Sequence, residues 1–227
     1  YFGKPSCIGG SNALTFGPKL KASMFDKTDI VDQIMEHSDA ALIVQHVQER
    51  LKDEQQRRRA FYDQIGEDDK AEFVNGEILF HSPVVKMHNV ATKYLLKLLD
   101  TFVEEHDLGF VSIEKILTQF TRNDYEPDIC FFGNEKAARF RDDQLLFPVP
   151  DFVVEVLSKS SQKTIEHDTV TKFNDYEQHG VQEYWIVDPH DQTVEQYLLE
   201  NGQYRLVLKA AEGSVHSRAV PGFSIPI

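Results

Sequence analysis

Two acidic residues stand beside apolar runs in the second half of the chain, where a charge is out of place. Asp128 comes directly before the apolar stretch ICFF, and Glu155 lies inside DFVVEVL, residues 151–157. The alternation of side chains in 151–157 predicts a β-strand. Burying an unpaired carboxylate costs free energy, so Glu155 needs a cation, a hydrogen-bond donor or a proton as its partner.

A third acid and a lysine complete a set that suits hydrolysis of a phosphodiester. Glu77 follows a predicted turn, and Lys172 borders the apolar stripe of the helix after 151–157. Neighbouring strands lie roughly 4.8 Å apart, so Asp128 and Glu155 can share one divalent cation. Carboxylate oxygens suit Mg²⁺, or Mn²⁺ in its place, better than Zn²⁺. Such a metal lowers the pKa of bound water, and a lysine stabilises charge that develops on the phosphate.

The elements that must position these residues follow from periodicity and turn signals. Asn75-Gly76 separates two alternating runs, which predicts a β-hairpin. A wide apolar face from Lys86 to Asp107 predicts the strongest helix. The element order suggests one sheet flanked by helices. The other expected elements are strands at 110–120, 128–132, 151–157 and 183–188, a helix from about Thr164, and a hairpin across Asn201-Gly202.

Composition restricts the class of protein and its compartment. The 227 residues carry a net charge of −13, which argues against a non-specific nucleic-acid coat, because phosphate binding rewards Lys and Arg. No apolar run approaches the roughly 20 residues of a membrane-spanning helix, so no membrane partner is expected. Neither Cys7 nor Cys130 belongs to a zinc-binding spacing. Together with the lack of a secretory signal, these features favour the cytoplasm.

Three segments are expected along the chain. Residues 1–23 lack periodicity and are interpreted as a flexible leader, which could be an expression remnant before a natural start at Met24. Residues 24–70 are expected to form a helical extension, and 71–227 the main domain. The arginine run at 57–59 has two interpretations, a phosphate contact and a solvated helix face, of which the second is favoured. The extension is also the candidate interface of a homodimer.

These motifs resemble a known family. EPD at 126–128 followed by EVL at 155–157 is similar to the PD-(D/E)XK nuclease superfamily. The longer run EVLSKSS…HD…K…Y…GVQEYWIVDP is similar to its Uma2-like family of restriction endonucleases, also named domain of unknown function 820. The resemblance covers about 150 residues, from Phe73 to the C-terminus. It implies a restriction-endonuclease-like α/β (α+β) fold, with a central mixed β-sheet flanked by helices and an N-terminal helical extension.

The resemblance also implies a role for individual residues. Asp128 takes the place of the superfamily's metal-binding aspartate, and Glu155 that of the second acid on the same metal, with the carbonyl of Val156 nearby. The superfamily's lysine would fall at position 157, where this chain has Leu157. Lys172 in the next helix is the candidate that replaces it. The implied activity is a Mg²⁺-dependent endonuclease acting on DNA, as a homodimer that pairs two sites by twofold symmetry.

Two further residues match the family near its start. Glu77 and His88 correspond to an acid and a histidine that the family places in its N-terminal hairpin and helix. The loop after the strand of Glu155 is SKSS, where the family usually has an SPST-like sequence, so Lys159 stands in the place of proline. That departure leaves the acids untouched but can change the stiffness of the loop.

Each candidate residue also has a structural interpretation. Glu155 can be a buried acid paired with Lys172 alone. Asp128 can cap a local turn, and Lys172 can extend its amine to solvent. A charged residue such as Glu77 is common after a hairpin turn, and His88 can satisfy a local hydrogen bond at a helix start.

Two alternative functions stay open beside the nuclease. The acidic net charge and the missing lysine at position 157 also fit a non-catalytic module that keeps the fold for binding or assembly. The other alternative is a metal-dependent hydrolase of small phosphoesters.

Overall fold

The computed structural model describes residues 27–66, 69–81, 83–158 and 167–227. The predictions for the leader at 1–23 and for Lys159 lie outside these residues. The chain divides into two compact units, Tyr1–Leu51 and Lys52–Ile227. The second unit contains all the candidate site residues, and it also includes the C-terminal half of α2 (Ala40–Gln64), upstream of residue 71.

The described part of the first unit is helical. It consists of α1 (Lys27–Glu36) and the first turns of α2. Both helices expose apolar side chains to solvent, namely those of Ile30, Val31, Met35, Leu42 and Val47. Within the described part of the chain, no helix is long and apolar enough to cross a membrane.

A six-stranded sheet forms the centre of the second unit, in the order β11-β10-β9-β8-β6-β3. β8 and β9 run parallel and every other neighbouring pair is antiparallel, so the sheet is mixed as predicted. Its strands are β3 (Gly109–Ile113), β6 (Ile129–Gly133), β8 (Phe152–Val156), β9 (Glu183–Asp188), β10 (Thr193–Glu200) and β11 (Gln203–Ala210).

The prediction of one sheet was incomplete, because a five-stranded sheet lies beside the first, in the order β2-β1-β5-β4-β7. The expected strand at 110–120 divides at Glu114 and Lys115, whose φ angles of 37° and 50° turn the chain out of β3. The strands of the five-stranded sheet are β1 (Ala71–Val74), β2 (Glu77–Phe80), β4 (Leu117–Gln119), β5 (Asp124–Tyr125) and β7 (Leu146–Phe147). β12 (Ser214–His216) and β13 (Ser224–Pro226) form a separate pair.

Both predicted hairpins are confirmed. Asn75 and Gly76 have φ angles of 51° and 87°, and Asn201 and Gly202 have φ angles of 53° and 80°. Two successive positive φ angles define the turn whose twist matches that of antiparallel strands, and Asn-Gly adopts it most readily. The turns join β1 to β2 and β10 to β11.

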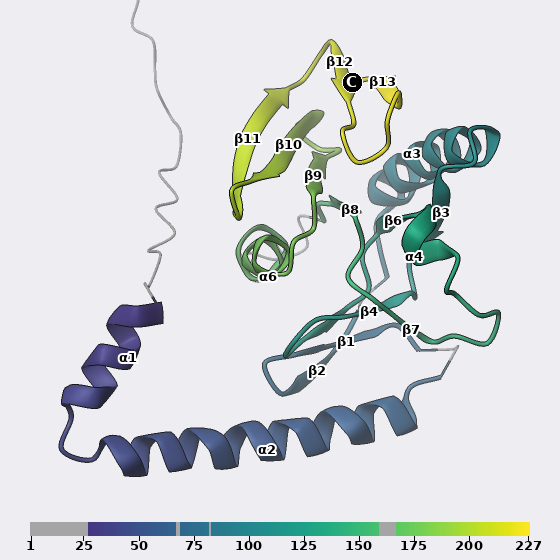
Figure 1. Ribbon diagram of the computed structural model, residues 1–227. Coiled ribbons are helices and arrows are strands. Elements are labelled where there is room, and N and C mark those ends of the chain that lie inside the picture. Colours follow the sequence, from purple (N-terminus) through teal and green to yellow (C-terminus); the bar gives the residue numbers. More distant parts are fainter. Residues whose placement is uncertain (1–26, 67–68, 82, 159–166) are drawn as a thin grey trace, which may run out of the picture. The chain divides into compact units, whose positions relative to one another are not determined.

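Helices cover both faces of the six-stranded sheet (Figure 1). α3 (Lys86–Glu105) packs Leu95, Leu99 and Val103 against Phe152 and Val154 on one face. Figure 1 shows α6 (Phe173–Gln178) on the other side of the sheet. There Tyr176 packs with Val153, Tyr184 and aromatic residues of the five-stranded sheet. The π-helix η1 (His167–Lys172) leads into α6, and the short α4 (Asn134–Ala137) follows β6.

A buried carboxylate holds the C-terminal segment against the sheet. Glu183 on β9 is fully buried. Its two oxygens accept five hydrogen bonds of 2.6–2.8 Å, from Trp185 Nε1, Gln196 Nε2, Ser217 Oγ and the backbone N–H groups of Arg218 and Ala219. Three of these donors belong to residues 217–219, directly after β12, so their hydrogen bonds to Glu183 hold this segment against the core.

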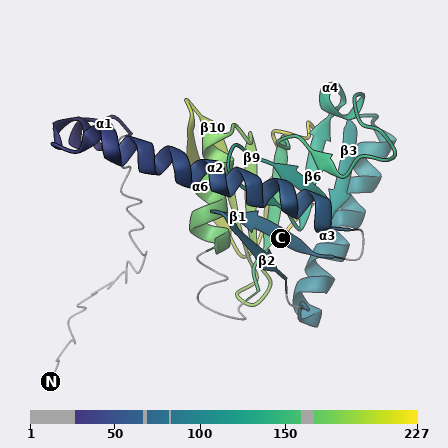
Figure 2. The same ribbon diagram turned by 90° about the horizontal axis from the view of Figure 1, so that it is seen from below.

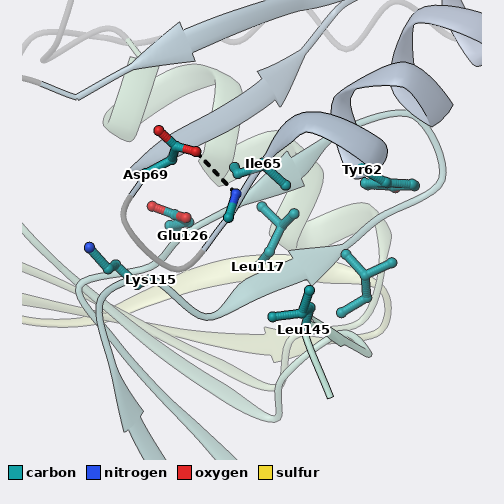
Figure 3. A pocket seen from close by; sticks show the side chains of 9 residues that line it. Tyr62, Ile65, Asp69, Lys115, Leu117, Glu126 and Leu145 are labelled. Carbon is teal, nitrogen blue, oxygen red and sulfur yellow. Dashed lines mark hydrogen bonds between the residues drawn. The ribbon is translucent and has the colours of Figure 1, made fainter. Parts of the chain in front are cut away.

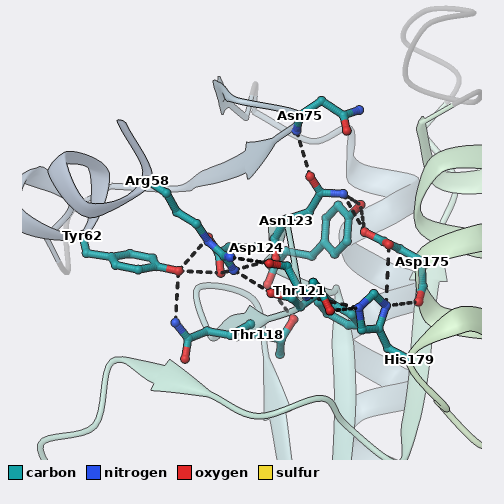
Figure 4. A network of polar contacts seen from close by, with 12 residues as sticks. Arg58, Tyr62, Asn75, Thr118, Thr121, Asn123, Asp124, Asp175 and His179 are labelled. Atoms are coloured by element: carbon teal, nitrogen blue, oxygen red, sulfur yellow. Dashed lines mark hydrogen bonds and ion pairs between the residues drawn. The ribbon is translucent and has the colours of Figure 1, made fainter. Parts of the chain in front are cut away.

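The C-terminal half of α2 is fixed to the five-stranded sheet by Arg58 (Figure 4). Its guanidinium donates to both carboxylate oxygens of Asp124, at 2.7 and 2.6 Å, and to backbone carbonyls of residues 120, 121 and 123. Tyr62 donates to the same carboxylate. Figure 2 shows this part of α2 running across β1, where Phe61 is buried against Phe73. Arg58 is therefore a structural residue, whereas the neighbouring Arg59 is exposed.

Replacing Arg58 with Met is expected to lower the free energy of unfolding by about 2–3 kcal/mol. The change leaves the fully buried carboxylate of Asp124 without its cation. Urea denaturation of the variant measures the loss. The matched control is Arg59→Met, which removes the adjacent positive charge from an exposed position and should change stability by less than about 0.5 kcal/mol. Equal effects of the two variants would show that the Arg58 contact carries no special weight.

Candidate active site

Lys172 points its amine into a group of carboxylates. It is the last residue of η1, and only 2% of its surface is exposed. The Nζ atom lies 3.0 Å from Oε1 of Glu155 and 3.0 Å from Oε1 of Glu72. The structural alternative of a solvent-exposed lysine is thus wrong. A π-helical turn is rare in proteins and is frequently found at functional sites.

Glu155 lies on the face of β8 that looks toward α6. Its neighbours Phe152, Val154 and Val156 point to the α3 face, as the alternation predicted. Oε1 of Glu155 accepts a hydrogen bond of 2.8 Å from the Tyr176 hydroxyl in addition to the contact with Lys172. The partners that this buried acid requires are therefore the ammonium of Lys172 and the hydroxyl of Tyr176.

Asp128 directly precedes β6, the strand that pairs with β8. Ile129 pairs with Val154, so continuing the antiparallel register places Asp128 opposite Glu155. Oδ2 of Asp128 accepts the backbone N–H of Val156 at 2.8 Å. Burial alone would raise the pKa of Asp128, but the contact with His88, the Val156 N–H and the charge of Lys172 hold that pKa below its usual value. These contacts favour the carboxylate form of Asp128.

His88 joins this group from the first turn of α3. Its Nε2 atom lies 3.1 Å from Oδ2 of Asp128, and only 3% of its surface is exposed. Thr92, one turn later, donates to the His88 carbonyl at 3.0 Å and lies 3.5 Å from the other ring nitrogen. The histidine contacts the acid directly and orients it.

The structure does not bring Glu77 to this group. Glu77 starts β2, the outermost strand of its sheet, and its side chain is exposed. The acid that the hairpin contributes is Glu72 in β1, which is fully buried and contacts Lys172. All four residues of β1 are buried, so no alternation in the sequence marks Glu72 as pointing inward. The sequence analysis named Glu77 as the site acid of this hairpin, whereas the acid that the structure places beside Lys172 is Glu72.

Glu126 is a second acid that sequence reasoning missed, although it belongs to the EPD motif. Its backbone N–H donates to Oε1 of Glu72 at 3.0 Å, and 4% of its surface is exposed. Burial and the charge of Glu72 raise the pKa of its carboxyl group to about 7. Among the described residues, none forms a hydrogen bond with its Oε2 atom.

Lys172 is the cation that links the acids of this group. It pairs with Glu72 and Glu155, and its charge also lowers the pKa of Asp128. Buried charges are stable only when they are paired or protonated. The pKa of Glu126 is raised mainly by burial, and next by the charge of Glu72, whereas His81 and Lys70 act to lower it.

The donor atoms are of the kind that Mg²⁺ takes. No three His, Cys, Asp or Glu side chains of the described residues form a complete metal site by themselves. Mg²⁺ usually binds through one or two carboxylates and completes its shell with water and substrate phosphate, so a full protein cage is not required. Asp128 and Glu155, at the ends of neighbouring strands, fit this smaller requirement.

The mixed sheet, the flanking helices and the acids at adjacent strand ends define a restriction-endonuclease-like fold. The sequence model of the family described as "Uma2: Putative restriction endonuclease" matches residues 53–227. The chain belongs to this family, and the resemblance found in the motifs is confirmed. The match starts within α2, next to the first residue of the second structural unit.

A solved structure has the same fold. It is described as a putative nuclease belonging to DUF820 from Anabaena variabilis, and it is 19% identical to this chain with a TM-score of 0.57. The similarity covers 70% of this chain and 88% of that one. At this identity the likeness supports the fold alone. Among curated proteins, none matches the sequence.

Proposed function

We propose that this protein is a metal-dependent nuclease that hydrolyses phosphodiester bonds of DNA. The observation that carries the proposal is the position of Lys172, whose amine lies 3.0 Å from Glu155 and is close enough to Asp128 to lower the pKa of that acid. Two strand-end carboxylates with a buried lysine are the groups that phosphodiester hydrolysis needs. Membership of the family described as "Putative restriction endonuclease" supports the choice of a polynucleotide as substrate.

Asp128, Glu155 and the carbonyl of Val156 are the proposed ligands of a Mg²⁺ ion, for which Mn²⁺ can substitute. When bound, the ion would supply a water of lowered pKa and positive charge next to the phosphate. Calorimetric titration with Mn²⁺ tests the site directly. Heat that saturates with the native protein and disappears with Glu155→Gln supports the ligand set, and no heat from the native protein removes the metal from the proposal.

The residues around the two acids prepare them for this role. His88 and the N–H of Val156 both contact Oδ2 of Asp128 and so fix the direction of that carboxylate. The Tyr176 hydroxyl fixes Glu155 in the same way. The proposed role of Lys172 is to stabilise negative charge on a phosphate oxygen next to these acids, and the ion pair with Glu72 supports this role by fixing the amine. Such preorganised charge accounts for a large part of catalysis in many enzymes.

Supercoiled plasmid incubated with the protein and Mg²⁺ tests the activity. We expect conversion to the nicked circle that stops when EDTA removes the metal. Some linear product should form by paired cuts if the protein is a homodimer, because twofold symmetry brings two sites to the two strands. The exposed apolar residues of α1 and α2 are the proposed dimer surface. Absence of nicking with both Mg²⁺ and Mn²⁺ contradicts the proposal.

A non-catalytic module is the second candidate, and one observation favours it. Lys172 forms ion pairs with both Glu72 and Glu155, so these groups also satisfy one another without a ligand. Binding of Mn²⁺ without cleavage of either plasmid or single-stranded DNA would favour this module or a hydrolase of small phosphoesters. Release of nitrophenol from bis(p-nitrophenyl) phosphate separates those two.

A further inference from the structure

α3 carries an apolar strip that faces solvent, besides the face that it packs against the six-stranded sheet. The strip consists of Met87, Tyr94 and Leu98, whose side chains are 48%, 59% and 50% exposed. Spacings of seven and four residues place these side chains on one side of the helix. The sheet therefore covers only part of the apolar surface of α3.

A groove of about 480 Å³ lies beside the strip. α3 forms one part of its wall, and the end of β9, the start of β10 and residues 225–227 form the rest. Most of these side chains are apolar. The cavity at the end of α2 is different, because Asp69, Lys115 and Glu126 give it a polar end (Figure 3). An exposed apolar surface with charged residues at its edge is typical of a contact with another protein.

The charges of α3 are separated by sign along the helix, since all its lysines precede all its acids. The lysines are Lys86, Lys93 and Lys97, and the acids are Asp100, Glu104 and Glu105. The helix dipole favours acids in the first turn and bases in the last turn, and α3 has neither. The stability of the helix itself therefore does not explain this order of charges.

The charged residues also border the apolar strip. Each lysine directly precedes one residue of the strip, so the three lysines lie along one edge of it. Glu104 follows Lys97 by seven residues and continues the same edge toward the end of the helix. When two such helices pack antiparallel about a twofold axis, the same edge of each helix meets, and the lysines of one lie against the acids of the other.

We propose that the strip and the groove bind a second copy of this chain, with the two α3 helices antiparallel. The apolar strips then cover each other, and the charge order that disfavours a single helix becomes complementary between two copies. The inference goes beyond the proposed function, because it involves neither the metal site nor bond cleavage. The surface belongs to the second unit and does not include α1, so a chain that also uses the proposed contact of α1 and α2 associates beyond a dimer.

Reversal of charge at either end of α3 tests the antiparallel arrangement. One variant carries Lys86→Glu and Lys93→Glu, and the other carries Glu104→Lys and Glu105→Lys. In each variant alone, like charges meet at both ends of the contact. Sedimentation velocity should therefore show half the native mass and a dissociation constant raised at least tenfold. An equimolar mixture of the two variants brings opposite charges together again and should recover the native mass at low salt.

A pair of leucine substitutions tests the apolar strip. Leu98→Glu places a charge in its centre and should also halve the mass. Leu206→Glu on β11 is the matched control, because Leu206 is 47% exposed and should leave the mass unchanged. Val31→Glu on α1 examines the other proposed contact separately.

Several results would overturn the proposal. These are a native protein that does not associate, a native mass for either charge variant alone or for Leu98→Glu, and no recovery of mass when the two charge variants are mixed. Loss of association in Val31→Glu alone would assign the contact between copies to α1 instead. Because sedimentation uses neither metal nor DNA, each of these results leaves the outcome of the plasmid assay as it stands.

Discussion

Replacing Asp128 with Asn is expected to lower the rate of Mg²⁺-dependent plasmid nicking by about 10²–10³-fold. Asn has nearly the same shape and keeps an oxygen that can accept the Val156 N–H, so the fold should persist. The substitution removes the negative charge that the pKa of Asp128 shows to be stabilised in this position. Initial rates at saturating Mg²⁺, together with a thermal unfolding midpoint, measure the two effects separately.

Asp142→Asn is the matched control for this prediction. Asp142 is an exposed aspartate, so the Asp142→Asn variant should nick DNA at the native rate. Retention of activity by the Asp128 variant alone would remove Asp128 from the site. Equal nicking by the native protein, Asp128→Asn and Lys172→Met alike would identify the activity as a contaminant.

Replacing Lys172 with Met is expected to abolish nicking and also to lower the free energy of unfolding by about 3–5 kcal/mol. The side chain keeps its length but loses the ammonium, so Glu72 and Glu155 remain buried as like charges without a cation. Urea denaturation measures the loss. Lys97→Met, which removes an exposed lysine from α3, should have little effect on either quantity.

A second substitution distinguishes the charge effect from a packing defect. In Lys172→Met/Glu155→Gln one of the two uncompensated charges is removed, so stability should recover by more than about 1 kcal/mol while activity stays absent. A double variant that is less stable than Lys172→Met would show that packing of the lysine stem, and not its charge, is the source of the effect.

Much of the site geometry could be predicted from the chain itself. The alternation of 151–157 placed Glu155 on one face of a strand, and the preceding apolar run at 129–132 placed Asp128 at the start of a strand that pairs with it. Lys172 was expected to reach the same place from the following helix, and it contacts Glu155 from the π-helical turn η1, which the sequence did not indicate. Which roles these residues have remains a proposal.

The alternation of side chains along the hairpin could not decide between Glu72 and Glu77. The hairpin turn at Asn75-Gly76 was evident, yet β1 is covered on both faces while β2 lies at a sheet edge. Only the positions of η1 and the second sheet decide which acid is buried, and these contacts join residues about a hundred positions apart. Glu126 was missed for the same reason, since its neighbour Glu72 is remote in sequence.

Trp185 is the single tryptophan of the chain, and its hydrogen bond to Glu183 makes its fluorescence sensitive to the contacts of that carboxylate. Trp185 donates its indole N–H to the carboxylate that also receives the backbone of Arg218 and Ala219. Detachment of the C-terminal segment would wet this indole and shift its emission to longer wavelength. Intrinsic fluorescence can therefore follow the release of one peripheral segment without any label.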